Sequence, residues 1–290
     1  MQVPRGCRTQ SMLTAHTENL DPAHTAAHFR EHGFAPLGQV LTKVAAESLG
    51  ARADVLMRGV APHPGVFYQH DSTTGLYADL RFGEGWVGPS DRYRKLEKLE
   101  ADPGFAKFIE NDFFDRITRQ FLGDDVRLYR SVLWNKAPQV GMAVPWHQDD
   151  GRFWGLDRPP FLQVWTALDD APAEAGCLEV VPGSHHHGLA TAEGGTIPDD
   201  RLHDVHGQPK TLLLAAKRGE SFLVHNHIWH RTGRNQTGSP RRAISLSFLD
   251  GNTRCRRKRR APRQFKRVFR SNSRAPHVKG ESSSDSGKGS

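Results

Sequence analysis

The sequence predicts an α+β domain whose core is an antiparallel β-sandwich or barrel, with helices packed on it. Two observations predict this class. The first 120 or so residues carry apolar side chains at helical spacing, whereas the later ones form short runs rich in β-branched and aromatic residues. Helices followed by a run of strands are typical of such domains, and 290 residues suffice to bury a substantial core.

The chain is expected to begin with a flexible leader over residues 1–15. A first helix is predicted within residues 21–37, because Asp21 is a typical N-cap residue and Pro22 follows it in the first turn. The charged and apolar residues that follow continue an amphipathic pattern.

Two further stretches predict helices before the strands begin. Residues 41–60 have apolar positions at helical spacing, which indicates a second helix. Residues 91–123 predict two more helices, which Asp102 and Pro103 separate and which Gly123 ends. The N-terminal part is therefore expected to be helical.

After residue 125 the pattern changes to strands separated by Gly, Pro and Asp turns. The stretches are short, and their composition favours a pleated, half-buried surface. The predicted strands lie within residues 126–137, 161–171, 176–183, 211–216, 220–233 and 241–251.

One domain over residues 16–253 accounts for these elements, and the charge of the chain changes after it. Residues 254–290 contain thirteen Lys or Arg and two acidic residues, so their net charge is about +11. The whole chain carries +8, so residues 1–253 carry about −3. We expect residues 254–270 to form a basic arm that packs on the domain through Phe265 and Phe269, and residues 271–290 to be disordered. An arm that binds nucleic acid is the alternative, but no platform of stacking aromatics accompanies the charge, so we expect no nucleic-acid partner.

Cysteine content and hydropathy limit the location of the protein. The three cysteines, Cys7, Cys177 and Cys255, are odd in number and far apart, which argues against a disulfide framework and favours the cytoplasm. The sequence contains no apolar run long enough to span a bilayer, so we expect no membrane partner. It does not indicate an oligomeric state.

A candidate metal site lies in the stretch PWHQDDGRFWG, residues 145–155. His147 and Asp149 are two residues apart, so at a strand end their side chains would point the same way. Such a pair is common by itself, but His230 follows a later strand and Arg241 starts the next one. Two histidines and one carboxylate form the facial triad that suits non-haem Fe(II), and an arginine fork suits a carboxylate of a cofactor.

In their order, the motifs HQDD, ALDDAPAEAGCLEVVPGSH, HRTGRN and RRAISLSF resemble the phytanoyl-CoA dioxygenase family. The resemblance runs from about Glu31 to Phe269. It implies a double-stranded β-helix, also called a jelly roll, with N-terminal helices packed on it. It also implies Fe(II) as the metal, 2-oxoglutarate as the cosubstrate and O₂ as the oxidant.

The resemblance carries over to single positions of this chain. His147, Asp149 and His230 match the iron ligands and would be the catalytic residues. Five positions match residues that bind 2-oxoglutarate: Arg241, Thr232, Trp165, Lys95 and Val132. The match at Lys95 is ambiguous by one position. Phe153 and Trp154 are candidates for the substrate side.

Several of these residues have rivals. His225 or His227 could replace His230 as the third ligand, and Asp150 could replace Asp149. Arg242 competes with Arg241, since only one of two neighbours on a strand points inward. Trp165, Phe153 and Trp154 could also be ordinary structural aromatics.

The reaction that the resemblance implies is the oxidation of a substrate C–H bond, coupled to the conversion of 2-oxoglutarate to succinate and CO₂. Asp149 argues for hydroxylation, desaturation or ring closure, because related halogenases have Gly or Ala at this point. The loops around the site are polar, and they favour a small-molecule metabolite or natural-product intermediate as substrate. The alternatives are an acyl-CoA hydroxylase, a non-catalytic jelly-roll protein, or a nucleic-acid-associated protein that uses the basic arm.

Overall fold

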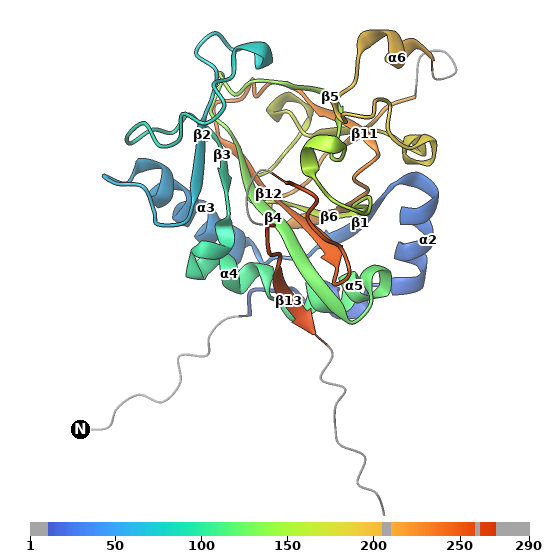
Figure 1. The fold of residues 1–290 in the computed structure, drawn as a ribbon. Helices are drawn as coiled ribbons and strands as arrows, with labels where there is room; N and C mark the ends of the chain where they lie inside the picture. Colours follow the sequence, from blue (N-terminus) through green and yellow to red (C-terminus); the bar gives the residue numbers. More distant parts are fainter. Residues whose placement is uncertain (1–10, 205–209, 259–261, 271–290) are drawn as a thin grey trace, which may run out of the picture.

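A computed structural model describes residues 11–204, 210–258 and 262–270, and two antiparallel sheets dominate it (Figure 1). The larger, eight-stranded sheet has the order β1-β10-β6-β12-β4-β3-β2, and β13 pairs with β4. The smaller, five-stranded sheet has the order β8-β5-β11-β7-β9. The two sheets enclose the inner space of a double-stranded β-helix, as the sequence predicts.

The strands of the larger sheet are β1 (Phe34–Gln39), β2 (Phe67–His70), β3 (Tyr93–Glu97), β4 (Asp125–Lys136), β6 (Leu162–Ala167), β10 (Glu220–Val224), β12 (Arg241–Asp250) and β13 (Lys266–Arg270). Those of the smaller sheet are β5 (Val144–Gln148), β7 (Leu178–Val181), β8 (Gly195–Thr196), β9 (Leu212–Leu214) and β11 (Trp229–Thr232).

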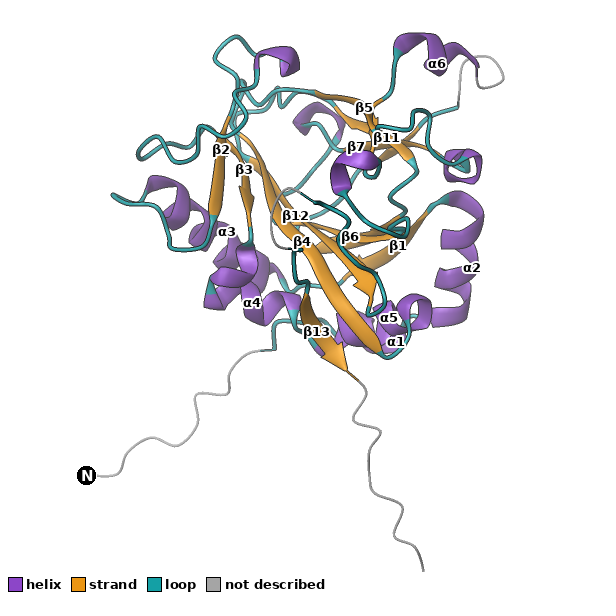
Figure 2. Cartoon of the chain, viewed as in Figure 1, coloured by secondary structure: helices purple, strands orange, loops and turns teal. Residues whose placement is uncertain are grey.

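Helices cover the outer face of the larger sheet (Figure 2). They are α1 (His16–Asn19), α2 (Pro22–His32), α3 (Lys43–Arg58), α4 (Pro103–Ile109) and α5 (Asp112–Leu122), and α6 (Asp199–Asp204) lies near the smaller sheet. The main hydrophobic core forms between these helices and the sheet; it includes Leu49 of α3, Phe105 of α4 and Phe114 of α5. Burial of such large apolar side chains is the main source of stability in this layer.

The first long helix has the capping that the sequence predicts. Asp21 Oδ1 accepts hydrogen bonds from the backbone N–H of Ala23 at 2.9 Å and of His24 at 3.2 Å. Gly33 ends the helix with φ at +78°, and a Cβ there would lie 2.6 Å from His185 Nδ1. Glycine is therefore required at this position by both backbone conformation and space.

Two N-terminal segments differ from the prediction. Residues 93–97 form strand β3, not a helix, because β2 and β4 pair with them on both sides. Tertiary pairing overrides the helical propensity of this charged segment. Part of the predicted leader is also packed on the domain: Leu13 forms a bridge with Leu41, and Thr14 N–H donates to Val40 O at 3.0 Å.

Residues of β12 alternate between the two sides of the larger sheet. Ile244, Leu246 and Phe248 belong to the core under the helices. Arg241 and Ser245 face the opposite way and line a cavity. The inner face of this sheet is therefore the place where polar residues gather.

The C-terminal basic segment packs on the domain in the residues that the structure describes. β13 pairs with β4, and Phe269 joins the main core. Phe265 packs in a smaller cluster with Tyr129 and Trp154. The predicted disorder of residues 271–290 lies outside the described residues.

The described helices include none that is long and apolar enough to cross a membrane. Cys177 and Cys255 are free. The cytoplasmic location stays a prediction.

A chain that ends at Asn252 should unfold at a lower temperature than the full chain, because it loses β13 and the burial of Phe265 and Phe269. Loss of one buried Phe side chain costs about 3–5 kcal/mol. A chain that ends at Arg270 should unfold like the full chain. Thermal unfolding followed by circular dichroism tests this, and equal midpoints for the two truncated chains would contradict it.

Candidate iron and cosubstrate site

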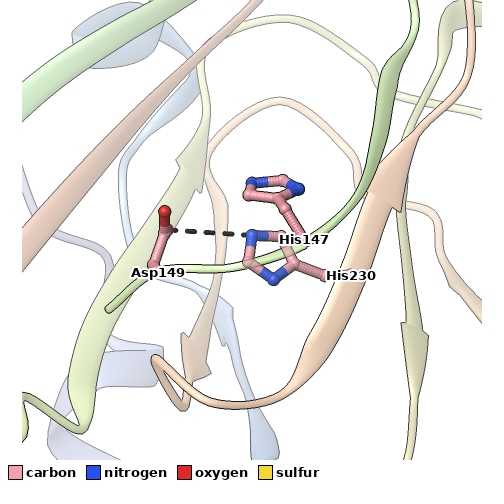
Figure 3. A group of neighbouring side chains, drawn as sticks. All are labelled: His147, Asp149 and His230. Atoms are coloured by element: carbon pink, nitrogen blue, oxygen red, sulfur yellow. Dashed lines mark ion pairs between the residues drawn. The ribbon is translucent and has the colours of Figure 1, made fainter. Parts of the chain in front are cut away.

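Three potential metal ligands meet inside the β-helix (Figure 3). His147 in β5 and His230 in β11 are direct partners in the antiparallel pairing of these strands. Asp149 follows β5 directly, and its Oδ2 lies 3.7 Å from His230 Nε2. One ligand atom from each of the three residues lies within 4.8 Å of those from the others. This arrangement suits one ion bound on one face, with positions left for other ligands.

Backbone carbonyls orient both imidazole rings. His147 Nδ1 lies 2.9 Å from Pro145 O, and His230 Nδ1 lies 2.9 Å from Ile228 O. A carbonyl oxygen can only accept, so each Nδ1 carries the proton and donates it. The Nε2 of each ring is thereby left with a lone pair for a metal.

The protonation states of the site also favour a metal. Burial, assisted by the neighbouring His230, lowers the pKa of His147 to about 4. Burial would raise the pKa of Asp149, but the electrostatic effect of His230, Arg130 and His147 lowers it to about 2. At neutral pH His147 is therefore neutral and Asp149 ionised, which are the forms that bind a metal.

Two amide side chains hold Asp149 in place. Gln163 Nε2 donates to Asp149 Oδ2 at 2.9 Å, and Asn226 Nδ2 donates to Asp149 O at 2.8 Å. Gln163 Oε1 in turn accepts from Ser245 and Ser247 of β12. This network fixes the carboxylate relative to the larger sheet.

A cavity extends from the three ligands to Arg241 and Thr232, which also line it. Arg241 is 2% exposed, and burial lowers its pKa to about 10, so it stays charged. Arg241 Nε and Thr232 Oγ1 are buried without a hydrogen-bond partner among the described residues. Buried donors of this kind normally have acceptors. A carboxylate in the cavity would supply them.

Arg242, the rival of Arg241, points to the other side of the sheet. Its Nε lies 2.8 Å from Asp169 Oδ2, and its Nη1 lies 2.9 Å from Asp54 Oδ1 of α3. Arg242 thus ties β12 to the covering helix, while Arg241 is left for the cavity.

Of the other three residues predicted to bind the cosubstrate, one lines the cavity and two do not. Trp165 lines the cavity. Val132 is fully buried and pairs with Ser245, which lines the cavity, but Val132 itself does not. Lys95 forms an ion pair with Glu97 and does not line it, whereas its neighbour Arg94 does. The one-position ambiguity of the sequence match falls at this pair.

The two substrate-side candidates have distinct environments. Phe153 is 52% exposed. Trp154 is buried and stacks on Tyr129, with ring centroids 4.5 Å apart. Neither lines the cavity beside the three ligands.

The rival ligands lie apart from the group of three. His227 Nε2 lies 2.8 Å from Asp150 Oδ2, so these two residues satisfy each other. His225 packs against His185, with ring centroids 4.8 Å apart. None of the three belongs to the group that could hold a metal.

Sequence reasoning missed Gln163 and Asn226, which hold Asp149, and Lys136, a buried residue that lines the cavity. Gln163 lies two residues before Trp165 in a fully buried strand, and Lys136 lies two after Trp134. Residues two apart on a strand point to the same face, so the alternation of the strand could have placed these polar residues beside the aromatic residues that line the cavity. Asn226 follows a strand and carries no such signal.

Comparison with known proteins agrees with this geometry. The family model described as phytanoyl-CoA dioxygenase matches residues 29–243, which is most of the chain. The chain belongs to the phytanoyl-CoA dioxygenase family. A peroxisomal phytanoyl-CoA dioxygenase of Mus musculus is 25% identical over 239 residues, which cover 78% of this chain and 68% of that protein.

Two other similar proteins carry the names of a hydroxylase and an epimerase. An L-proline trans-4-hydroxylase of Streptomyces griseoviridis is 30% identical over 170 residues, or 51% of this chain and 63% of that protein. The crystal structure of the epimerase SnoN with Fe³⁺, alpha-ketoglutarate and nogalamycin RO superposes with a TM-score of 0.65. It is 19% identical and covers 82% of this chain and 88% of that one, so it supports the shared fold.

The family member described here is an Fe(II)- and 2-oxoglutarate-dependent oxygenase. The group of His147, Asp149 and His230 is compatible with iron, and the buried donors of Arg241 and Thr232 are compatible with a dicarboxylate cosubstrate.

The folded protein should become less stable as the pH is lowered below 6.5, partly because of His225. Burial and the nearby His185 lower the pKa of His225 from 6.5 to about 3. Between these two values the unfolded chain binds the proton that the folded chain excludes. Each pH unit below 6.5 should therefore cost about 1.4 kcal/mol at this residue. The free energy of unfolding in urea, measured at pH 7 and pH 5, should change less with pH in His225→Asn than in the unchanged protein. The control His24→Asn, at an exposed residue, should show the same change as the unchanged protein. An equal change in all three proteins would contradict the assignment to His225.

Proposed function

We propose that this oxygenase hydroxylates, or otherwise oxidises, a C–H bond of a small-molecule metabolite or natural-product intermediate. The observation that carries this proposal is one cavity lined both by the three potential metal ligands and by the unpartnered donors of Arg241 and Thr232. Metal and cosubstrate would thus be held side by side in a partly enclosed cavity. Exclusion of water from such a space strengthens every electrostatic contact inside it.

His147, Asp149 and His230 would hold the iron. Bound iron with 2-oxoglutarate and O₂ supplies the oxidising power, while 2-oxoglutarate becomes succinate and CO₂. The protein contributes orientation: Pro145 O and Ile228 O fix the histidine rings, and Gln163 fixes the carboxylate. Loss of outer contacts of this kind typically costs about 10–100-fold in metal affinity or activity.

Arg241 and Thr232 would bind the distal carboxylate of 2-oxoglutarate. Arg241 offers a planar fork, and Thr232 Oγ1 offers a hydroxyl from the strand that also carries His230. Trp165, whose side chain lines the cavity, would flank the carbon chain of the cosubstrate. Arg94 lines the cavity where Lys95 does not, so Arg94 is the better candidate for a contact from β3.

The names of similar proteins support a small-molecule metabolite or natural-product intermediate as the substrate. The similar proteins include one named for hydroxylation of L-proline and one crystallised with nogalamycin RO. The carboxylate of Asp149 would be the third metal ligand, which supports oxygenation over halogenation. Hydroxylation of an acyl-CoA is the second candidate, because the mouse relative carries the name phytanoyl-CoA dioxygenase.

Replacing His230 with Ala should abolish iron binding, because the two remaining ligands are too few to retain the ion during purification. Iron retained after gel filtration, measured by mass spectrometry, tests this. The matched control is His227→Ala, which removes a nearby histidine outside the group and should keep one iron per chain. The reverse result would make His227 the third ligand.

Replacing Arg241 with Lys should raise the KM for 2-oxoglutarate by about one to two orders of magnitude, because the charge stays but the two-pronged contact is lost. The rate at saturating 2-oxoglutarate should fall less, since the oxidation takes place at the iron. Succinate formation measures both constants. Arg242→Lys is the control and should affect stability instead; a KM effect in Arg242→Lys alone would sink the assignment of Arg241.

A further inference from the structure

Arg130 lies on the inner face of the larger sheet, within electrostatic range of the carboxylates of Asp149 and Glu97 but without an ion pair to either. It occupies β4 between strands β3 and β12, at the position opposite Ser247. Its guanidinium makes no hydrogen bond or ion pair with any residue that the structure describes. A partly buried cation normally finds an acceptor, because its desolvation is otherwise uncompensated.

The place of Arg130 relative to the potential iron ligands follows from the pairing of the strands. Ser247, its direct partner on β12, donates to Gln163 Oε1 at 3.0 Å, and Gln163 Nε2 donates to Asp149 Oδ2. Arg130 is also within electrostatic range of both His147 and Asp149. It therefore lies beside the iron site, yet it is not among the residues that line the cavity shared with Arg241.

Two tryptophans flank Arg130. Its guanidinium carbon lies 5.9 Å from the ring centroid of Trp134 and 5.2 Å from that of Trp154. Aromatic faces orient a guanidinium without using its N–H groups. The N–H groups of Arg130 are thus left for a ligand.

Four cations, Arg94, Lys95, Arg130 and Arg263, lie around two carboxylates, Glu97 and Asp149, so positive charge is in excess in this region. Glu97 is a nearby carboxylate, but its ion pair is with Lys95. Arg263, from the C-terminal basic segment, lies over the ring of Tyr129 at 4.9 Å and also acts on Glu97. An excess of positive charge around a partly buried arginine attracts an anionic group.

We propose that Arg130 forms an anion-binding subsite for the substrate, which would carry a carboxylate or phosphate group next to an apolar or aromatic portion held by Trp134 and Trp154. This inference rests on the proposed function and names the class of its substrate. It also gives the C-terminal basic segment a part in the active site, because Arg263 adds to the field that selects the anion.

The test uses the full chain with Fe(II) and saturating 2-oxoglutarate without O₂. Benzoate and phenyl phosphate are the anionic probes, and benzamide is the uncharged probe of the same shape. Calorimetric titration should show binding of at least one anionic probe and at least tenfold weaker binding of benzamide. A preference for benzoate or for phenyl phosphate tells which anion the subsite fits.

Arg130→Gln should weaken binding of the preferred anion at least tenfold, and Arg130→Lys should lose less. Arg58→Gln removes an exposed charge at the end of α3 and should bind like the unchanged protein. The proposal is overturned if neither anion binds the unchanged protein, or if Arg130→Gln binds it equally well. It is also overturned if Arg130→Gln instead loses 2-oxoglutarate, since Arg130 would then serve the cosubstrate.

Iron and 2-oxoglutarate binding by the unchanged protein are measured in the same samples. Failure of those two measurements would contradict the proposed function itself. Failure of the anion titration alone would contradict the subsite and leave the proposed function standing.

Discussion

The pairing of β5 with β11 is the interaction on which the rest of the site depends. It sets His147 directly opposite His230, and each ring is then oriented by the backbone carbonyl of the residue two positions earlier in the sequence. Because side chains alternate along a strand, a slip of one residue would turn one imidazole out of the β-helix. The geometry of the potential metal site is therefore a property of backbone register, and the side chains add only the final contacts.

Neighbouring residues of one strand serve opposite sides of the sheet. Arg242 is neutralised by Asp169 and Asp54 and holds a helix against the sheet, while Arg241 is left unneutralised within the β-helix. An unpaired buried charge costs stability unless a ligand compensates it. The protein tolerates that cost at Arg241 because the covering layer of helices and core residues is large, which is the usual relation between a rigid framework and a polar site.

Much of this arrangement could be predicted from the sequence, and the exceptions have physical causes. The longer strands β4, β6, β7, β10, β11 and β12 follow from local alternation and composition. Alternation shows that only one of Arg241 and Arg242 can point inward, and the family resemblance selected Arg241 and the three potential ligands. β3 was predicted as a helix because its charged residues have helical propensity, and only pairing with β2 and β4 overrides it. Asn226 and Arg130 could not be recognised, because their importance arises from contacts with residues far away in the chain.

The order in which the strands are connected has a consequence for the synthesis of the protein. β1, near the N-terminus, pairs with β10, and the central strand β12 is inserted between β6 and β4. A ribosome must therefore release the chain to the end of β12 before these strands of the larger sheet can pair. Until then the apolar faces of the earlier strands lack their partners, and such non-local pairing folds slowly. The potential metal site likewise cannot form before β11 has been synthesised, because His230 of β11 has to pair with His147 of β5.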